Sequence, residues 1–114
     1  MKITQEEICL LVNKPCLSRG KIYFKEGMVE LTVVEFDRVS AWVIGSRAYE
    51  VSFKRIAQTI HGHCTCPAFR DEGSCKHLAA AGFALIQHYE GSYEPSEAYF
   101  EKASFFKCRW KSLL

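Results

Sequence analysis

The sequence Cys64-Thr65-Cys66-Pro67-Ala68-Phe69-Arg70-Asp71-Glu72-Gly73-Ser74-Cys75-Lys76-His77 brings three thiols and one imidazole into a short stretch of chain. They follow the spacing Cys-x-Cys, eight intervening residues, and Cys-x-His. Zn²⁺ binds thiolate sulfur at about 2.3 Å and imidazole nitrogen at about 2.0 Å, and four protein donors complete a tetrahedral structural site. We therefore predict one structural zinc ion, with no open position for hydrolysis, bound by Cys64, Cys66, Cys75 and His77.

The surrounding residues predict which elements carry the two pairs. Alternate side chains of an extended strand share one face, so Cys64 and Cys66 can reach the same ion. Pro67 then leaves the strand because it has no N–H to donate to a ladder. An Ala/Leu-rich helical pattern begins beside Cys75 and His77. The ion is thus predicted to join the end of the last strand to the first turn of the following helix.

This arrangement resembles the SWIM zinc finger, whose signature is Cys-x-Cys followed, after a variable insert, by Cys-x-His. The segment 18–29, with Arg-Gly, an aromatic residue and Gly-x-Val, is similar to the family's lead-in to its sheet. The likeness spans roughly residues 17–90. It implies a zinc-binding recognition module of a kind found in bacterial helicase-associated proteins, transposases and ubiquitin-linked proteins, in which DNA binding or protein contact is inferred.

Six cysteines in a short chain are also compatible with a disulfide scaffold or a redox pair. Disulfide scaffolds are secreted and loop-rich, whereas this chain starts Met1-Lys2 without an apolar signal segment. Cys-x-Cys also lacks the two-residue spacer of thioredoxin-type motifs. We therefore favour zinc. Cys9, Cys16 and Cys108 are predicted to be thiols outside the metal site, which favours a reducing compartment, the cytoplasm or, in a eukaryote, the nucleus.

Three further histidines can compete for the metal. His61 and His63 precede Cys64 in the same strand, but alternation puts them on the face that the cysteines do not share. His88 lies late in the following helix, where an ordinary surface residue is expected. None is assigned to the metal.

The rest of the chain predicts an α+β fold, with a small antiparallel sheet of about four strands and flanking helices. Thr4-x-x-Glu7 has the form of a capping box before a short helix, and Gly27 is expected to close a second helical or turn segment. Strands are expected where apolar residues recur with a period of two, including Val29, Leu31 and Val33 on one face. These strands are 29–36, 39–44, 49–53 and 59–64, a long helix covers 78–91, and a last helix restarts at Pro95.

Both faces of the predicted sheet carry apolar residues. Phe36, Trp42 and Ile44 are either available to a partner or covered by the terminal segments. We favour covering by the terminal segments, because an exposed apolar residue by itself does not indicate a function.

At 114 residues the chain has the length of a single domain. We divide it into an N-terminal helical extension (1–16), a SWIM-type zinc-binding domain (17–91) and a C-terminal aromatic and basic helical extension (92–114) packed on the same domain. Its apolar runs fall short of the ~20 residues needed to span a bilayer, so we expect a soluble protein without a membrane partner.

Catalytic patterns are missing from the sequence. It has no nucleophile–base pair, no paired catalytic carboxylates and no Gly-rich phosphate loop. We therefore predict that the protein is not an enzyme and has no small-molecule substrate.

Charge leaves two functions open. Lys and Arg exceed Asp and Glu by 15 to 13, so the net charge is only +2, although the two ends of the chain are richer in cations. The first function is nucleic-acid binding, DNA above all, with Trp42 or Tyr49 stacking on bases. We expect this function in a helicase, recombination or transposition system. The second is a protein-docking adaptor that uses the sheet or the aromatic tail around Trp110 and hands its partner to a helicase or recombination factor. The alternative for each basic residue is a solvated charge. The candidate nucleic-acid contacts are Arg19, Lys21, Lys25, Arg47, Lys54, Arg55, Arg70 and Lys76.

Overall fold

The computed structural model describes the backbone of residues 1–112 and the side chains of residues 1–106. Cys108 and Trp110, which enter the predictions above, therefore have side chains outside the described residues. Over the described range the chain forms five helices and a four-stranded antiparallel sheet, which confirms the predicted α+β class. The elements are α1 (Gln5–Leu11), α2 (Lys14–Lys25), β1 (Val29–Val34), β2 (Arg38–Ile44), β3 (Ala48–Ile56), β4 (Thr59–Cys64), α3 (Pro67–Glu72), α4 (Lys76–Glu90) and α5 (Glu97–Ser112).

The strands lie in the sheet in chain order, β1-β2-β3-β4, each antiparallel to the next. The turn between β3 and β4 consists of Ala57 and Gln58, which have φ angles of 50° and 68°. Positive φ at both central positions matches the twist of a two-residue hairpin, but Asn and Gly are the residues that usually supply it. The sequence marks this turn poorly for that reason.

A bulge interrupts the alternation expected along the first strand. Leu31 pairs with Ala41 and Val33 pairs with Ser40, so the register shifts between the two pairs. An extra residue in one strand reverses the faces of the residues that follow it. Val34, rather than Val33, accordingly packs on the main core. The predicted alternation is therefore wrong in the second half of this strand.

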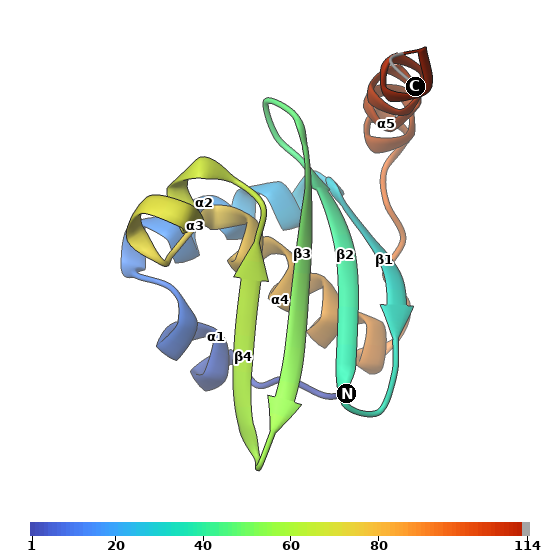
Figure 1. Cartoon of the computed structure of the whole chain (residues 1–114). Helices are drawn as coiled ribbons and strands as arrows, with labels where there is room; N and C mark the ends of the chain where they lie inside the picture. Colours follow the sequence, from blue (N-terminus) through green and yellow to red (C-terminus); the bar gives the residue numbers. More distant parts are fainter. Residues whose placement is uncertain (113–114) are drawn as a thin grey trace.

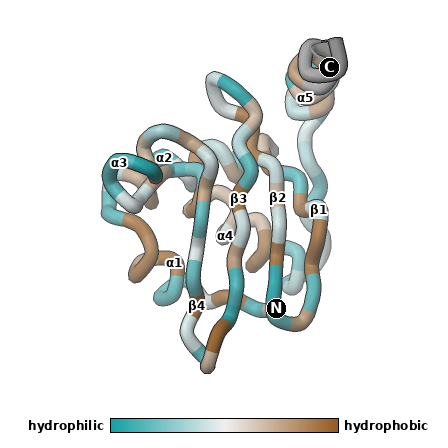
Figure 2. Tube along the Cα trace, viewed as in Figure 1, coloured by the Kyte–Doolittle hydropathy of each residue, from teal (hydrophilic) through white to brown (hydrophobic). Residues whose placement is uncertain are grey.

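Helix α4 lies across one face of the sheet and forms the centre of the core (Figure 1). Its residues Leu78 and Leu85 are buried in one cluster with Val39, Val51 and Phe53 from the strands. Figure 2 shows hydrophobic and hydrophilic stretches alternating along the strands, as expected for a sheet with one covered face. None of the helices within residues 1–112 is long and apolar enough to cross a membrane.

The cap before α1 and the cap after α2 lie where the sequence predicts them, whereas the start of α2 at Asn13 was not predicted. Thr4 and Glu7 form the predicted capping box at the start of α1. Asn13 caps α2, where its side-chain oxygen accepts a hydrogen bond from the Cys16 N–H at 2.9 Å. Gly27 follows α2 with a φ of 71°, which confirms the predicted left-handed cap.

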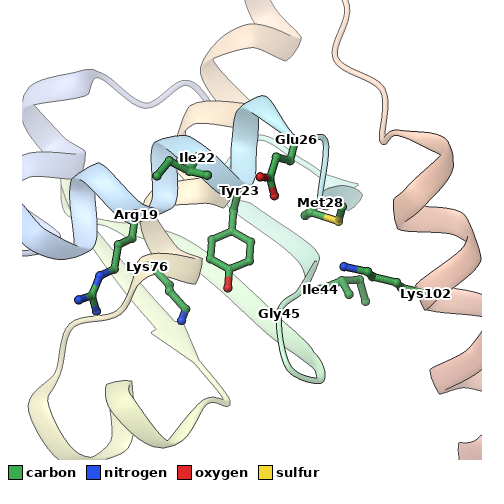
Figure 3. A pocket seen from close by; sticks show the side chains of 9 residues that line it. All are labelled: Arg19, Ile22, Tyr23, Glu26, Met28, Ile44, Gly45, Lys76 and Lys102. Atoms are coloured by element: carbon green, nitrogen blue, oxygen red, sulfur yellow. The ribbon is translucent and has the colours of Figure 1, made fainter.

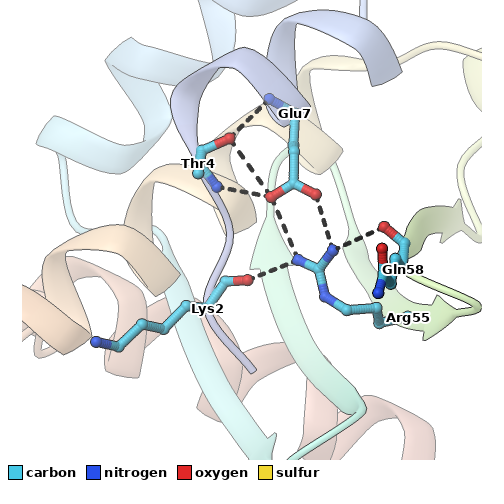
Figure 4. Close-up of polar contacts among 5 residues, drawn as sticks. All are labelled: Lys2, Thr4, Glu7, Arg55 and Gln58. Atoms are coloured by element: carbon cyan, nitrogen blue, oxygen red, sulfur yellow. Dashed lines mark hydrogen bonds and ion pairs between the residues drawn. The ribbon is translucent and has the colours of Figure 1, made fainter.

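Arg55 ties the N-terminal segment to the sheet (Figure 4). Its guanidinium forms a bidentate ion pair with Glu7, with nitrogen–oxygen distances of 2.9 and 3.2 Å. It also donates to the backbone carbonyls of Lys2 at 2.8 Å and Gln58 at 3.3 Å. Arg55 was predicted as a nucleic-acid contact, but its guanidinium is engaged in these internal contacts.

Helix α5 packs on the end of the sheet mainly through Tyr99, with Phe106 partly buried against the same cluster. Tyr99 is fully buried in a second cluster with Met28, Ile44 and Ala103. Its hydroxyl donates a hydrogen bond to the Glu30 carboxylate at 3.1 Å. Burial, with the nearby Glu30 charge, raises the pKa of Tyr99, so this hydroxyl keeps its proton at neutral pH.

The three apolar residues that were candidates for a free surface differ in how far their side chains are exposed. Ile44 is 1% exposed in the cluster below α5, and Trp42 is half-buried against the same cluster. The preferred prediction, covering by a terminal segment, is therefore confirmed for these two. Phe36, in the turn between β1 and β2, is 94% exposed, so the predicted covering is wrong for this residue.

Candidate metal centre

The first ligand pair lies where a strand passes directly into a helix. Cys64 is the last residue of β4, and its side chain points to the covered face of the sheet. Cys66 is the N-cap of α3, and its sulfur accepts a hydrogen bond from the Phe69 N–H at 3.4 Å. Pro67 is the first residue of α3, a position that tolerates proline because its missing N–H would have no helical partner. The sequence analysis did not predict α3, although a cap followed by proline is the signal that marks it.

The second pair lies at the start of α4, as predicted. Cys75 is the N-cap, and its sulfur accepts a hydrogen bond from the Leu78 N–H at 3.4 Å. His77 follows in the first turn of the helix. The preceding loop is held by Ser74, whose hydroxyl accepts a hydrogen bond from the Asn13 N–H at 3.1 Å. The start of α2 therefore helps to position the second pair.

The four predicted ligands form one compact group. Their donor atoms lie within 4.8 Å of one another, and all four side chains are buried. Cys64 Sγ lies 3.8 Å from His77 Nδ1, close to the roughly 3.6 Å that separates two donors on a tetrahedral zinc ion with bonds of about 2.3 and 2.0 Å. A buried set of three thiols and one imidazole has the composition and size of a structural zinc site. The group can hold one metal ion, and Nδ1 is the nitrogen of His77 that faces it.

The thiols do not ionise equally. The Cys64 thiol and the Leu78 N–H donate hydrogen bonds to Cys75, which lowers the pKa of Cys75. The shared proton raises the pKa of Cys64, and burial raises the pKa of Cys66. Ionising all three sulfurs in this buried space requires a compensating cation. A divalent metal supplies that charge.

The other ring nitrogen of His77 is enclosed by the protein. Nε2 is buried and has no hydrogen-bond partner among the described residues. The ring packs against Tyr49 and Tyr23, with centroid distances of 4.6 and 5.9 Å. A Cβ added to Gly45 would lie 3.1 Å from Nε2, so the turn between β2 and β3 closes tightly over the ligand. Tyr49, a predicted stacking candidate, thus packs on a metal-ligand side chain.

The remaining histidines lie outside the cluster. His61 and His63 are exposed on the outer face of β4, on the opposite side from Cys64, as the alternation predicted. His63 packs edge-on against Phe69 of α3, with a centroid distance of 5.1 Å. His88 is exposed near the end of α4.

The predicted basic contacts are distributed over several elements. Arg19, Lys21 and Lys25 are exposed on α2, and Arg47 is exposed in the turn between β2 and β3. Lys54 lies on β3, where it pairs with Arg38 in the register of the sheet. Arg70, on α3, forms an exposed ion pair with Asp71 at 3.2 Å.

The structure brings two of these residues to one cavity of about 400 Å³ (Figure 3). Arg19 comes from α2 and Lys76 from the start of α4, one residue before His77. Lys102 of α5 joins them, although the sequence shows only that this end of the chain is rich in cations. No local pattern links these three positions, because the cavity forms only when α2, α4 and α5 pack together. Its complete lining is Arg19, Ile22, Tyr23, Glu26, Met28, Ile44, Gly45, Lys76 and Lys102.

Comparison with known proteins gave no match for this chain, whether with protein-family models, with curated proteins or with solved structures. The resemblance to the SWIM zinc finger therefore rests on the sequence alone, on the cysteine and histidine spacing and on the lead-in segment 18–29.

Proposed function

We propose that the chain is a SWIM-type module in which one structural Zn²⁺ holds the end of β4 to α4, and that the module binds nucleic acid, with DNA as the expected partner. The observation that carries this proposal is the buried group of Cys64, Cys66, Cys75 and His77, whose donors lie within 4.8 Å of one another. Bound zinc would supply a crosslink, because four protein donors leave no position for water. The proposal includes no enzymatic activity. The SWIM resemblance suggests a helicase, recombination or transposition system as the setting.

The metal centre itself does not attract a polyanion. Three thiolates and one Zn²⁺ carry a combined charge of about −1. Any attraction for phosphate must therefore come from the lysines and arginines around the centre. The zinc ion would therefore stabilise the fold, and a separate surface of lysines and arginines would bind the partner.

The best-supported surface for that contact is the exposed side of α2. Arg19, Lys21 and Lys25 are exposed there, and none of them forms a salt bridge within the described residues. Lys76 extends the group towards the metal centre, with its ammonium 5.4 Å from the centroid of the Tyr23 ring. Cations without acidic partners break no ion pair when they bind phosphate. Their binding releases the counterions that were condensed on the nucleic acid.

A binding titration at two salt concentrations tests the proposal. We expect single- and double-stranded DNA to bind with a salt-dependent affinity, because each phosphate contact on a duplex contributes roughly −0.9 to the logarithmic salt slope. The triple variant Arg19→Glu, Lys21→Glu and Lys25→Glu should bind more weakly, with a flatter salt dependence and an unchanged zinc content.

A matched control reverses three cations at the other end of the sheet. Lys2, Arg38 and Lys54 lie near the start of β2, away from the turn that closes over His77. Reversing them changes the net charge by the same amount. If this control, which includes the candidate contact Lys54, weakens binding as much as the α2 variant, the contact is not confined to α2 and the assignment to α2 is wrong.

The second candidate function is protein docking, and the exposed aromatic residues of α5 favour it. Phe100 and Phe105 are 53% and 59% exposed. If the wild-type protein binds neither DNA nor RNA at low salt, the nucleic-acid proposal fails. The docking adaptor then becomes the better-supported function.

A further inference from the structure

The cavity beside the metal centre gathers cations from three elements that are far apart in the sequence. Arg19, Lys76 and Lys102 line it from α2, α4 and α5. Figure 3 shows Arg19 and Lys76 on one side of the Tyr23 side chain and Lys102 on the other. Packing therefore places positive charge on both sides of an aromatic ring.

These charges are not neutralised within the described part of the chain. The salt bridges found there involve other residues. Glu26 is the one carboxylate in the lining, so three cations face one anion. Like charges brought together in this way repel one another and raise the local concentration of anions. The cavity is therefore suited to an anionic ligand.

The rest of the lining is apolar or aromatic. Its accessible part consists of Ile22, whose side chain is 57% exposed, and the half-buried Tyr23. Met28 and Ile44 complete the lining but are only 6% and 1% exposed. A volume of about 400 Å³ lies within the usual range of small-ligand sites, roughly 300–1,000 Å³. Cations on either side of an apolar, aromatic wall match a nucleotide in a single strand, whose base needs such a wall and whose flanking phosphates need the charges.

We propose that this cavity binds one unpaired nucleotide of a single-stranded nucleic acid. The base lies against Ile22 and Tyr23, the accessible apolar and aromatic side chains of the lining. The phosphate on one side of the base meets Arg19 and Lys76, and the phosphate on the other side meets Lys102. The inference rests on the proposed nucleic-acid binding and adds to it a preference for single strands, because the bases of a duplex are paired and stacked away from the protein.

The experiment compares the zinc-loaded 114-residue chain and its variants on a thymidine trinucleotide, the same trinucleotide lacking its central base, and a short duplex. We expect the intact trinucleotide to bind more tightly than the abasic one. Lys102→Ala should weaken its binding by about three- to tenfold, since one charged contact is lost. Ile22→Ser should weaken the intact trinucleotide more than the abasic one.

Lys21→Ala is the matched control, because Lys21 is an exposed cation on α2 outside the cavity lining. It should lower trinucleotide affinity less than Lys102→Ala. The cavity proposal is overturned if Lys102→Ala and Ile22→Ser leave trinucleotide binding unchanged while the α2 charge reversals still abolish DNA binding. It is also overturned if the duplex binds as tightly as one of its own strands alone, since the two differ in the pairing of their bases. If no nucleic acid binds at all, the proposed function fails as well.

Discussion

At the scale of single residues, Arg55 shows how one side chain can stabilise several segments. Its guanidinium reaches Glu7 in α1, the Lys2 carbonyl before that helix, and the Gln58 carbonyl in the β3–β4 turn. The same Glu7 carboxylate accepts the Thr4 N–H at 3.0 Å in the capping box. Both ends of the ion pair are therefore fixed by other contacts, which reduces the entropy lost in forming it. Such a pair contributes more than an isolated surface ion pair.

We predict that Glu7→Gln destabilises the protein in a pH-dependent way. The Arg55 guanidinium lowers the pKa of Glu7 below its usual 4.5. A carboxylate with a depressed pKa stabilises the fold above its unfolded-state pKa, and this stabilisation is lost as the pH falls through the folded-state value. The variant should lose about 1–2 kcal/mol of unfolding free energy at pH 7, and the difference should shrink below about pH 4.5.

Chemical denaturation at pH 7 and at pH 3.5 measures this difference. Subtracting the variant from the wild type removes the effect of acid on the cysteine cluster, which both proteins share. An equal difference at the two pH values would contradict the assigned role of the Glu7 charge.

At the scale of elements, the contact between α2 and α4 depends on one glycine. A Cβ at Gly20 would lie 2.4 Å from Ala79 Cβ and 2.6 Å from the Lys76 carbonyl oxygen. The helix backbones can approach this closely only without a side chain. Because Lys76 lies between Cys75 and His77, the separation of the two helices also affects the position of these candidate metal ligands.

We predict that Gly20→Ala lowers the free energy of unfolding by about 1–3 kcal/mol, although alanine is the better helix former by about 1 kcal/mol. The added methyl group pushes α4 away from α2, so zinc affinity should fall together with stability. Thermal unfolding and a zinc competition assay measure the two effects.

Gly91→Ala is the control for Gly20→Ala. Gly91 caps α4 with an extended φ of −178°, and a Cβ there meets no atom within 4 Å. It should change stability by less than about 0.5 kcal/mol. If both alanine variants behave alike, close helix packing does not explain the role of Gly20.

The sequence predicts elements well where one local rule decides them. The capping box at Thr4 and the cap at Gly27 are recognisable because a few neighbouring residues determine each. The β1 bulge cannot be recognised in this way, because it depends on the register with β2. The turn at Ala57 and Gln58 lacks the residues that usually mark such a turn. Helix α3 is only six residues long, too short for a hydrophobic period to identify it.

The same distinction applies to the candidate sites. Four ligands can be read from the sequence because Cys-x-Cys and Cys-x-His are local patterns at the end of a strand and the start of a helix. The cavity cannot be read from the sequence in the same way, because it forms only when α5 docks and places Lys102 opposite Lys76. Periodicity indicates that α5 has an apolar side but not where that side packs. Tyr99 determines this through its burial against Met28 and Ile44.

At the scale of the whole molecule, the candidate metal centre belongs to the main core. Cys64, Cys66 and Cys75 lie in the same cluster as Ile8 of α1 and Leu85 of α4. The cluster thus joins the predicted N-terminal extension to the central domain. An ion bound to these sulfurs would link β4, the start of α3 and the start of α4 at the point where the chain leaves the sheet. Its free energy of binding would contribute directly to folding, because the unfolded chain has no such arrangement of donors.

We predict that removing zinc, or changing Cys75 to Ser, lowers the stability of the entire protein. At free zinc about 1,000 times the dissociation constant, binding adds about 4 kcal/mol to the free energy of unfolding. The melting temperature should therefore fall by more than about 10 °C after chelation. Cys75→Ser should show the same decrease without chelator, together with loss of the metal.

The triple variant Cys9→Ser, Cys16→Ser and Cys108→Ser should keep one zinc per chain and a melting temperature that still falls on chelation. Freshly purified wild-type protein without zinc, or a triple variant that loses it, would show that the ligand set is misassigned.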